Sequence, residues 1–273
     1  IDIFQNNYKK KFLNQLISSQ LDVDRLDYLN RDSFYSGVNE GIINSNRIIS
    51  MFNIKNNELV VDQKGIYSIE KFIIARKLMY WQVYLHKTVL SAEHTLMNVL
   101  KRAKYLAKQK QHIYTTPAFK RFLYEQNTID ESFFNEENLL DKFSLLDDTD
   151  ILTCLKNWIY EKDIVLKNLS KAIIHRNLLK IKAIKKSNIK KELERFRKIA
   201  KNKFKINNTD VKYLVFSISI QNDTYNFMNN EIKFLKDNGT LVKLSDIKKE
   251  FSMNTRNSRI IKHYICYPEG CIY

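Results

Sequence analysis

Apolar residues recur every three or four positions along much of the chain, a spacing that is typical of α-helices. Residues 8–36 follow this pattern, with an internal break between Ser18 and Asp22 and a stop at Gly37 and Gly41. The N-terminal region is therefore predicted to be helical with one interruption.

A second helical pattern runs from Ser68, a candidate N-cap, to about Lys110, and a third covers residues 164–204. An acidic patch at 147–150 precedes a further helical stretch, and acids are favourable at the positive end of a helix dipole. We interpret this patch as a helix cap rather than a metal site. The apolar stripe predicted for the second pattern consists of Ile74, Leu78, Trp81, Leu85 and Val89.

The hydrophobic period shortens to two in several short stretches, which predicts strands. Residues 47–65 indicate two strands around an Asn-Asn turn, and residues 231–244 indicate a hairpin that turns at Asp237-Asn238-Gly239. Residues 211–220 and 263–268 are rich in β-branched and aromatic residues. We therefore expect a small antiparallel sheet, packed on helix, in the C-terminal part.

The predicted fold class is mainly α, with a small C-terminal antiparallel α+β portion. Two prolines and five glycines in 273 residues favour long helices with few tight turns. We expect three parts: residues 1–115, a helical extension over 116–205, and an α+β subdomain over 206–273. No apolar run approaches the roughly 18 residues of a membrane span, and three cysteines without ligand-like spacing fit a reduced cytosol. A cytoplasmic protein without a membrane partner is the expectation.

A formal net charge of +16 changes this picture by pointing to a polyanionic partner such as a nucleotide or nucleic acid. Residues 171–205 concentrate the charge, with fourteen Lys or Arg against Glu192 and Glu194. The whole chain is rich in Lys, Asn and Ile, however, so surface lysine is also its default composition. Nucleic-acid binding through this segment is therefore kept as an alternative and ranked last.

The stretch LDVDRLDYLNRD at residues 21–32 holds the first candidate site. Asp24, Tyr28 and Asp32 are four residues apart and share one helix face, with Arg25 and Arg31 at its edges. Two carboxylates and a phenol can bind a hard metal or a sugar hydroxyl. The simpler interpretation from spacing alone is a surface network in which Asp24, Asp27 and Arg31 pair with one another.

The second helical pattern carries another polar face, which favours a ligand site over a surface network. Arg76, Tyr80, Tyr84 and Lys87 fall at i, i+4, i+8 and i+11, so cations alternate with phenols. Arginine donates bidentately to phosphate, and lysine adds a point charge. Facing the acidic helix, this surface would suit a metal–triphosphate and its sugar. The two faces together indicate a nucleotide site.

The same residues carry a family resemblance. QLDVDRLDYLNRDSFYSGV (20–38) and ARKLMYWQVYLHKTV (75–89) resemble two signatures of the HD-domain deoxynucleoside triphosphate triphosphohydrolases, which include the bacterial dGTP triphosphohydrolases. The resemblance is specific over residues 15–110 and looser beyond. It implies an HD-domain-like helical bundle in a homodimer or homotetramer. It also implies hydrolysis of a dNTP to deoxynucleoside and triphosphate, with a divalent metal (Mg, Mn, Fe or Ni).

Roles follow from the resemblance position by position. Asp24 matches the last aspartate ligand of the metal. Arg25 matches a basic residue that contacts substrate phosphate, and this residue is lysine in the vertebrate member of the family. Asp32 matches the partner of the sugar 3′-hydroxyl, and Tyr28 the side chain that crowds out a 2′-hydroxyl. In the second signature, Arg76 and Tyr84 match positions that contact phosphate and sugar. Tyr80 stands where some relatives have His. His86 and Lys87 match positions near a regulatory nucleotide site.

The chain departs from the family in its metal ligands. Members hold the metal with His…His-Asp…Asp, and no His-Asp dipeptide occurs here, while all five histidines follow Asp24. The chain also begins with Ile, so the expectation is that the upstream half of the HD domain is absent and that the chain alone is inactive. A non-catalytic nucleotide sensor that uses the same pocket is the alternative function.

Overall fold

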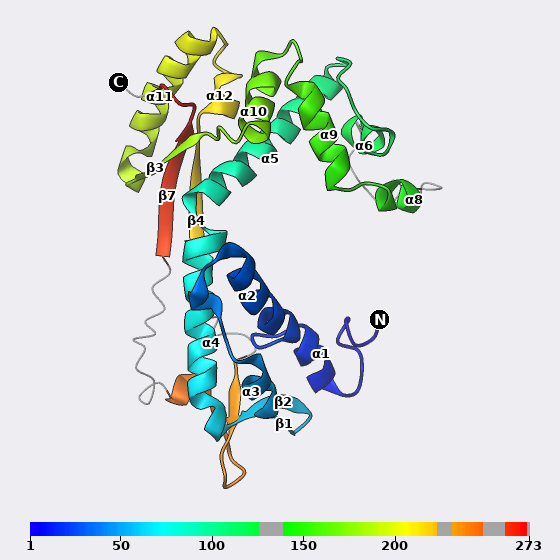
Figure 1. Ribbon diagram of the computed structural model, residues 1–273, viewed down its shortest axis with the longest axis vertical. Helices are drawn as coiled ribbons and strands as arrows, with labels where there is room; N and C mark the ends of the chain where they lie inside the picture. The colour runs from blue at the N-terminus through cyan, green and yellow to red at the C-terminus, as the bar shows by residue number, and fades with distance from the viewer. Residues whose placement is uncertain (126–138, 223–230, 248–259, 272–273) are drawn as a thin grey trace. The chain divides into compact units, whose positions relative to one another are not determined.

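The computed structural model describes four stretches of the chain: residues 1–125, 139–222, 231–247 and 260–271 (Figure 1). The chain divides into two compact units: unit 1, with residues 1–86 and 221–261, and unit 2, with residues 87–220 and 262–273. Each unit has its own sheet and helices. This division crosses the three-part organisation proposed from the sequence, which stays a prediction.

Unit 1 begins with two helices, α1 (Lys11–Ile17) and α2 (Val23–Ser36), separated where the sequence predicts a break. Gly37 ends α2 in the left-handed region, with φ of 71°, as a C-terminal glycine does. The short helix α3 (Ser45–Ser50) and the long helix α4 (Ile66–Met79) follow. The helix α4 starts two residues before Ser68, so the predicted cap is wrong.

The core of unit 1 forms around α4, which is apolar on several sides. Its fully buried residues are Ile69, Phe72 and Met79, and they pack with Leu26 and Leu29 of α2. The predicted stripe is therefore wrong in position: Ile74, Leu78, Trp81 and Leu85 are only half-buried and Val89 is exposed. In so apolar a helix several stripes fit the period, and only the neighbouring elements decide which one is buried.

A four-stranded sheet covers part of this core, in the order β1-β2-β5-β6. The predicted strand pair is present as β1 (Phe52–Lys55) and β2 (Glu58–Asp62), and Asn56 and Asn57 turn between them with positive φ. The predicted hairpin forms β5 (Lys233–Leu235) and β6 (Leu241–Lys243). The strand β5 pairs in parallel with β2, so a segment from the C-terminal part completes an N-terminal sheet.

Close packing beside α2 depends on Gly41 in the short 3-10 helix η1 (Asn39–Gly41). A Cβ atom added at this position would lie 2.6 Å from Sδ of Met79 and 3.0 Å from Cβ of Ser33. Both of these side chains are buried. Only glycine lets the chain pass between α2 and α4 at this point.

Unit 2 is built on the 22-residue helix α5 (Lys87–Lys108). The predicted acidic cap is confirmed at the start of the helix α9 (Asp148–Trp158), where Asp147 and Asp150 form a capping box. The other helices of this unit are α6 (Pro117–Leu123), α8 (Leu139–Ser144), α9 (Asp148–Trp158), α10 (Ile164–Ile174), α11 (Ile189–Phe204) and α12 (Val211–Leu214).

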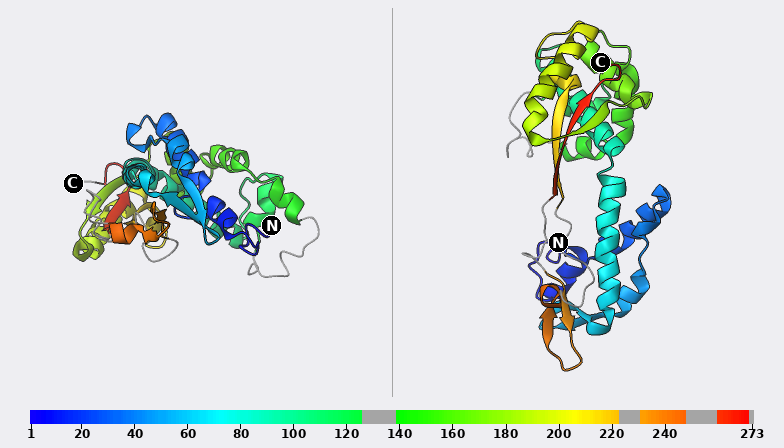
Figure 2. Two further views of the ribbon diagram at one scale, coloured as in Figure 1. Left: turned by 90° about the horizontal axis from the view of Figure 1, so that it is seen from below. Right: turned by 90° about the vertical axis from the view of Figure 1, so that its left-hand side faces the viewer.

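Three strands complete unit 2, in the order β3-β7-β4. The helix predicted over residues 164–204 is interrupted by β3 (Lys180–Ile184), which pairs antiparallel with β7 (Ile260–Tyr267). The strand β4 (Phe216–Asn222), yellow, lies on the other side of the red β7 (Figure 2). Residues 206–273, treated above as one subdomain, therefore contribute to two different sheets.

Unit 2 contains one buried arginine that ties three helices together. Arg102 of α5, 5% exposed, donates to both carboxylate oxygens of Asp163 at 3.1 and 2.6 Å and to Asp210 at 2.6 Å. Its guanidinium carbon also lies 5.1 and 5.4 Å from the ring centroids of Tyr105 and Tyr213. We call Arg102, Asp163 and Asp210 the arginine hub.

The observed fold confirms the predicted class: mainly α, with small sheets that include the C-terminal hairpin. Within the part of the chain that the structure describes, no helix is both long and apolar enough to span a bilayer.

Candidate functional site

The first signature lies at the beginning of α2, where Asp22 is the N-cap. Its carboxylate accepts hydrogen bonds from the backbone N–H of Arg25, at 2.9 Å, and of Ser19, at 3.2 Å. The same carboxylate pairs with the guanidinium group of Arg25. Asp22 is 2% exposed, so both the helix start and the side chain of Arg25 are fixed by a buried anion.

A hydrogen bond joins the two predicted faces. The hydroxyl of Tyr84 donates to Oδ2 of Asp32 over 2.7 Å, across 52 residues of sequence. The ring of Tyr84 meets the rings of Tyr28 and Tyr80 edge to face, with centroid distances of 6.1 and 5.3 Å. We call Asp32, Tyr28, Tyr80 and Tyr84 the tyrosine cluster.

Arg76 borders this cluster from α4. One of its guanidinium nitrogens donates to Oε1 of Gln20 at 3.1 Å, and its guanidinium carbon lies 5.8 Å from the ring centroid of Tyr80. The Nε atoms of both Arg76 and Arg25 are buried and make no hydrogen bond to any residue that the structure describes. Two cationic donors thus flank the tyrosine cluster with bonding capacity left for an anion.

The phenols of Tyr28 and Tyr84 stay protonated at neutral pH because the pKa of each is raised. Burial raises the pKa of Tyr84, and the hydrogen bond to Asp32 raises it further. Burial also raises the pKa of Tyr28, although the nearby Arg76 and Arg25 oppose the shift. These hydroxyl groups can therefore donate hydrogen bonds, while Oδ1 of Asp32 has no partner among the described residues and can accept one.

The second signature does not form one continuous α-helix as predicted. Residues Tyr80–Tyr84 form a π-helix, closed by a 2.7 Å hydrogen bond from the N–H of Leu85 to the carbonyl of Tyr80. The wider turn and the break before α5 shift the helical register. The register that would align Lys87 with Tyr84 is lost, and exposed His86 and Lys87 lie on either side of the boundary between the units.

The predicted surface network forms only in part. Arg31 pairs with Asp27 at 2.6 Å, and both side chains are more than half exposed. Asp24 is exposed, and within the described stretches it has no polar partner. The network interpretation thus accounts for Asp27 and Arg31. Asp32 is instead bonded to Tyr84, and Arg25 to Asp22.

A metal does not fit the described residues as a complete site. Within the four described stretches, no group of three or more His, Cys, Asp or Glu side chains lies close enough to hold an ion. Asp24 offers a single carboxylate, and one ligand holds a divalent ion too weakly to be useful. No chemical step is therefore assigned to a metal on these residues.

Two residues of this site were not identified from the sequence. Asp22 was considered only as a helix break, although an aspartate three residues before Arg25 is an N-cap pattern that could have revealed it. Gln20 carries no such signal, because its partner Arg76 is 56 residues away.

Comparison with known proteins bears on the same region. Residues 43–116 match the family described as "HD associated region". YwfO of Bacillus subtilis, an uncharacterised protein, is 33% identical over 177 residues, covering 65% of this chain and 39% of YwfO. An HD domain-containing protein of Acanthamoeba polyphaga mimivirus is 36% identical over 95 residues, covering 33% of this chain and 20% of the viral protein.

A solved structure extends the similarity to nearly the whole chain. A phosphohydrolase from Bacteroides thetaiotaomicron superposes with a TM-score of 0.88 at 40% identity, covering 97% of this chain and 66% of that protein. The chain is thus similar both to an HD domain-containing protein and to a phosphohydrolase, and part of it matches the HD associated region. The chain spans 39% of the length of YwfO and 20% of the length of the viral protein.

Proposed function

We propose that this chain forms the sugar- and phosphate-binding part of a metal-dependent dNTP triphosphohydrolase. The observation that carries the proposal is the Tyr84–Asp32 hydrogen bond, because it unites the two signatures in one cluster. The cluster offers a carboxylate acceptor, the hydroxyl groups of Tyr28 and Tyr80 and, beside it, two guanidinium groups. Those groups match the chemistry of a deoxyribose joined to a polyphosphate.

The roles in this proposal are those that the family resemblance implies, and the following contacts support them. Oδ1 of Asp32 accepts a hydrogen bond from the sugar 3′-hydroxyl, while Tyr84 holds the carboxylate in place. Tyr28 packs against Tyr84 and restricts space for a 2′-hydroxyl. Arg25 and Arg76 bind phosphate oxygens through their guanidinium groups, and Tyr80 supports Arg76.

The remaining roles are carried by the family resemblance. Asp24 would contribute one carboxylate to a divalent metal, and such an ion would supply Lewis-acid chemistry to the hydrolysis. His86 and Lys87 contact an effector nucleotide, and the protein assembles as a homodimer or homotetramer. Because the described residues supply a single metal ligand, we expect the chain by itself to bind dNTP without turnover.

Binding and turnover test separate parts of the proposal. Calorimetric titration of the chain with each dNTP and its ribonucleotide should show a preference for dNTP, reduced by Asp32→Ala and Arg76→Gln. Asp27→Ala is the matched control, because this carboxylate lies on α2 but pairs only with exposed Arg31. Equal weakening by Asp27→Ala, or no dNTP binding at all, would refute the site.

Turnover is measured on the longest natural protein that carries this chain, as release of triphosphate from each dNTP with each divalent metal. Loss of release in Asp24→Ala is the expected outcome. Saturable dNTP binding that needs Asp32, with no triphosphate release under any metal, would instead establish the nucleotide sensor.

A further inference from the structure

Unit 2 carries a hollow on its surface that the proposed nucleotide site does not use. Its lining residues come from α11 and from the segment that leads into α12, two elements that lie side by side in Figure 1, and its volume is about 340 Å³. That volume is at the small end of the range for ligand pockets. We call it the basic hollow, and its lining residues are Glu194, Arg197, Lys198, Lys201, Asn208, Val211 and Lys212.

The local fold explains why four cations meet there. Arg197 and Lys201 are one turn apart on α11, so they project from the same face. Lys205 then ends the helix in the left-handed conformation, with φ of 52°, and the chain turns back. Buried Val211 anchors the start of α12, which brings Lys212 to the opposite side of the hollow.

The cations of the basic hollow are not neutralised by the described residues. The half-buried Arg197 donates its Nε–H to the backbone carbonyl of Val215 at 3.1 Å, and Lys201 donates to the amide oxygen of Asn208 at 2.9 Å. Both partners are neutral. No ion pair to Arg197, Lys198 or Lys212 occurs within the described part of the chain. Burial lowers the pKa of Arg197, the direction expected for a cation without a compensating anion.

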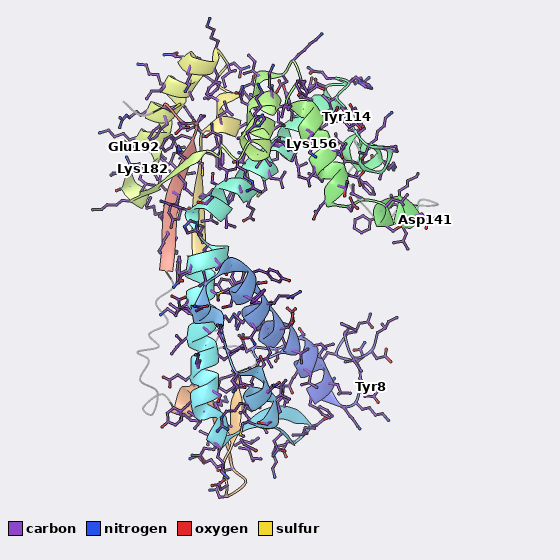
Figure 3. All side chains as sticks on the ribbon, in the orientation of Figure 1. Tyr8, Tyr114, Asp141, Lys156, Lys182 and Glu192 are labelled. Atoms are coloured by element: carbon purple, nitrogen blue, oxygen red, sulfur yellow. The ribbon has the colours of Figure 1, made fainter. Side chains whose placement is uncertain are left out.

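Three charged side chains near the basic hollow that do not line it have partners of their own. Glu192 pairs with Lys182 at 3.5 Å and with Arg195 at 3.6 Å, and Figure 3 shows Lys182 and Glu192 on neighbouring elements. Lys203 donates to the carbonyl of Glu269 at 2.6 Å. The exposed Lys190 and Lys191 also lie on α11, but they do not line the basic hollow.

We propose that the basic hollow binds a compact linear polyphosphate, either free triphosphate or the polyphosphate group of a nucleotide. Four cations and one carboxylate, Glu194, leave three positive charges to be matched by an anion. Arg197, held in place by the Val215 carbonyl, supplies a planar donor for phosphate oxygens, and the lysines supply point charges. An extended nucleic acid strand would also engage exposed cations outside the hollow, such as Lys190 and Lys191, so the test compares the two sets.

The test is calorimetric titration of the whole chain with sodium tripolyphosphate, ATP, inorganic phosphate and a single-stranded oligonucleotide. The pocket variant combines Lys198→Gln and Lys212→Gln, because neither side chain has a structural partner in the described residues. Its matched control combines Lys190→Gln and Lys191→Gln, which removes the same charge from exposed positions at the other end of α11. Arg76→Gln reports binding at the nucleotide site of unit 1.

The pocket variant should bind tripolyphosphate about tenfold more weakly, with the control variant within twofold of the parent. Equal affinity for ATP and tripolyphosphate would identify a bound nucleotide tail, and tighter tripolyphosphate binding would identify the free anion. Loss only in Arg76→Gln would assign the binding to unit 1 and overturn the proposal. Equal weakening by both lysine pairs, with tighter oligonucleotide binding that falls steeply with salt, would overturn it in favour of a nucleic-acid surface.

Discussion

Arginines of the two units differ in how fully their nitrogens are hydrogen-bonded. In the arginine hub of unit 2, Arg102 makes three hydrogen bonds to two carboxylates and is enclosed by two aromatic rings. In unit 1, Arg25 and Arg76 each keep a buried Nε–H without a partner in the described residues. An arginine whose three nitrogens all have hydrogen-bond partners offers little to a ligand. An arginine with an unpaired N–H group can still bind an anion. The first arrangement is architectural and the second suits binding.

The largest effect is expected in the arginine hub. Arg102→Met leaves Asp163 and Asp210 without their partner, and breaking a buried ion pair in this way costs about 3–5 kcal/mol of unfolding free energy. Urea denaturation would give the loss, and hydrogen exchange should locate it in unit 2. Arg76→Gln is the comparison, expected to cost about 1 kcal/mol because one neutral-acceptor bond is lost. Equal losses would remove the distinction between the two groups.

A smaller effect should follow from Gly41→Ala. The added methyl group meets buried Met79, and overpacking of this kind costs about 1–3 kcal/mol. Hydrogen exchange of α2 and α4 should rise, together with weaker dNTP binding, because these helices position the two signatures. Gly239→Ala is the control, since its Cβ would meet nothing within 4 Å although its φ is 76°. A smaller loss for Gly41→Ala than for Gly239→Ala would contradict the close packing.

The Tyr84–Asp32 bond should matter more for binding than for stability. Tyr84→Phe removes a hydrogen bond to a carboxylate, worth about 1.5–3 kcal/mol at most, and frees Asp32 to move. We expect a several-fold loss of dNTP affinity in calorimetry. Tyr80→Phe keeps the ring and removes a hydroxyl without a hydrogen bond among the described residues, so it should have little effect. If both variants lose affinity equally, the bond to Asp32 is not the reason.

The raised pKa of Tyr84 predicts a dependence of stability on pH. The folded chain holds this proton to higher pH than the unfolded chain, whose tyrosines titrate near about 10. Its contribution to stability is therefore complete below about pH 10 and is lost as the pH rises above that value. Denaturant titrations between pH 8 and 11 should show a steeper decline for the parent chain than for Tyr84→Phe.

The smallest effect is expected for the exposed pair on α2. Asp27→Ala or Arg31→Ala removes an ion pair between side chains that are 62% and 57% exposed, and such pairs contribute about 0.3–0.5 kcal/mol. Denaturation midpoints should shift only slightly, and less in high salt. A loss comparable to that of Tyr84→Phe would restore the surface-network interpretation of the acidic helix.

The sequence by itself determined the features that depend on near neighbours. The break before Asp22, the turn at Asn56-Asn57, the acidic cap of α9 and the hairpin at Asp237-Asn238-Gly239 all appear where their patterns predict them. Caps and turns are set by the conformational preferences of a few adjacent residues, so local sequence suffices. The residue types that form the tyrosine cluster were also identified from the spacing along two helices.

Tertiary structure alone decided how distant segments meet. The parallel pairing of β5 with β2 joins strands more than 170 residues apart, and the buried face of α4 was chosen by its neighbours rather than by its period. The π-helix at Tyr80–Tyr84 has no signal in the apolar pattern, yet it sets the register of the second signature. The partners of Arg102 and Arg76 lie far away in sequence. Only the fold therefore determines that Arg102 is hydrogen-bonded to two carboxylates while Arg76 keeps an Nε–H without a partner in the described residues.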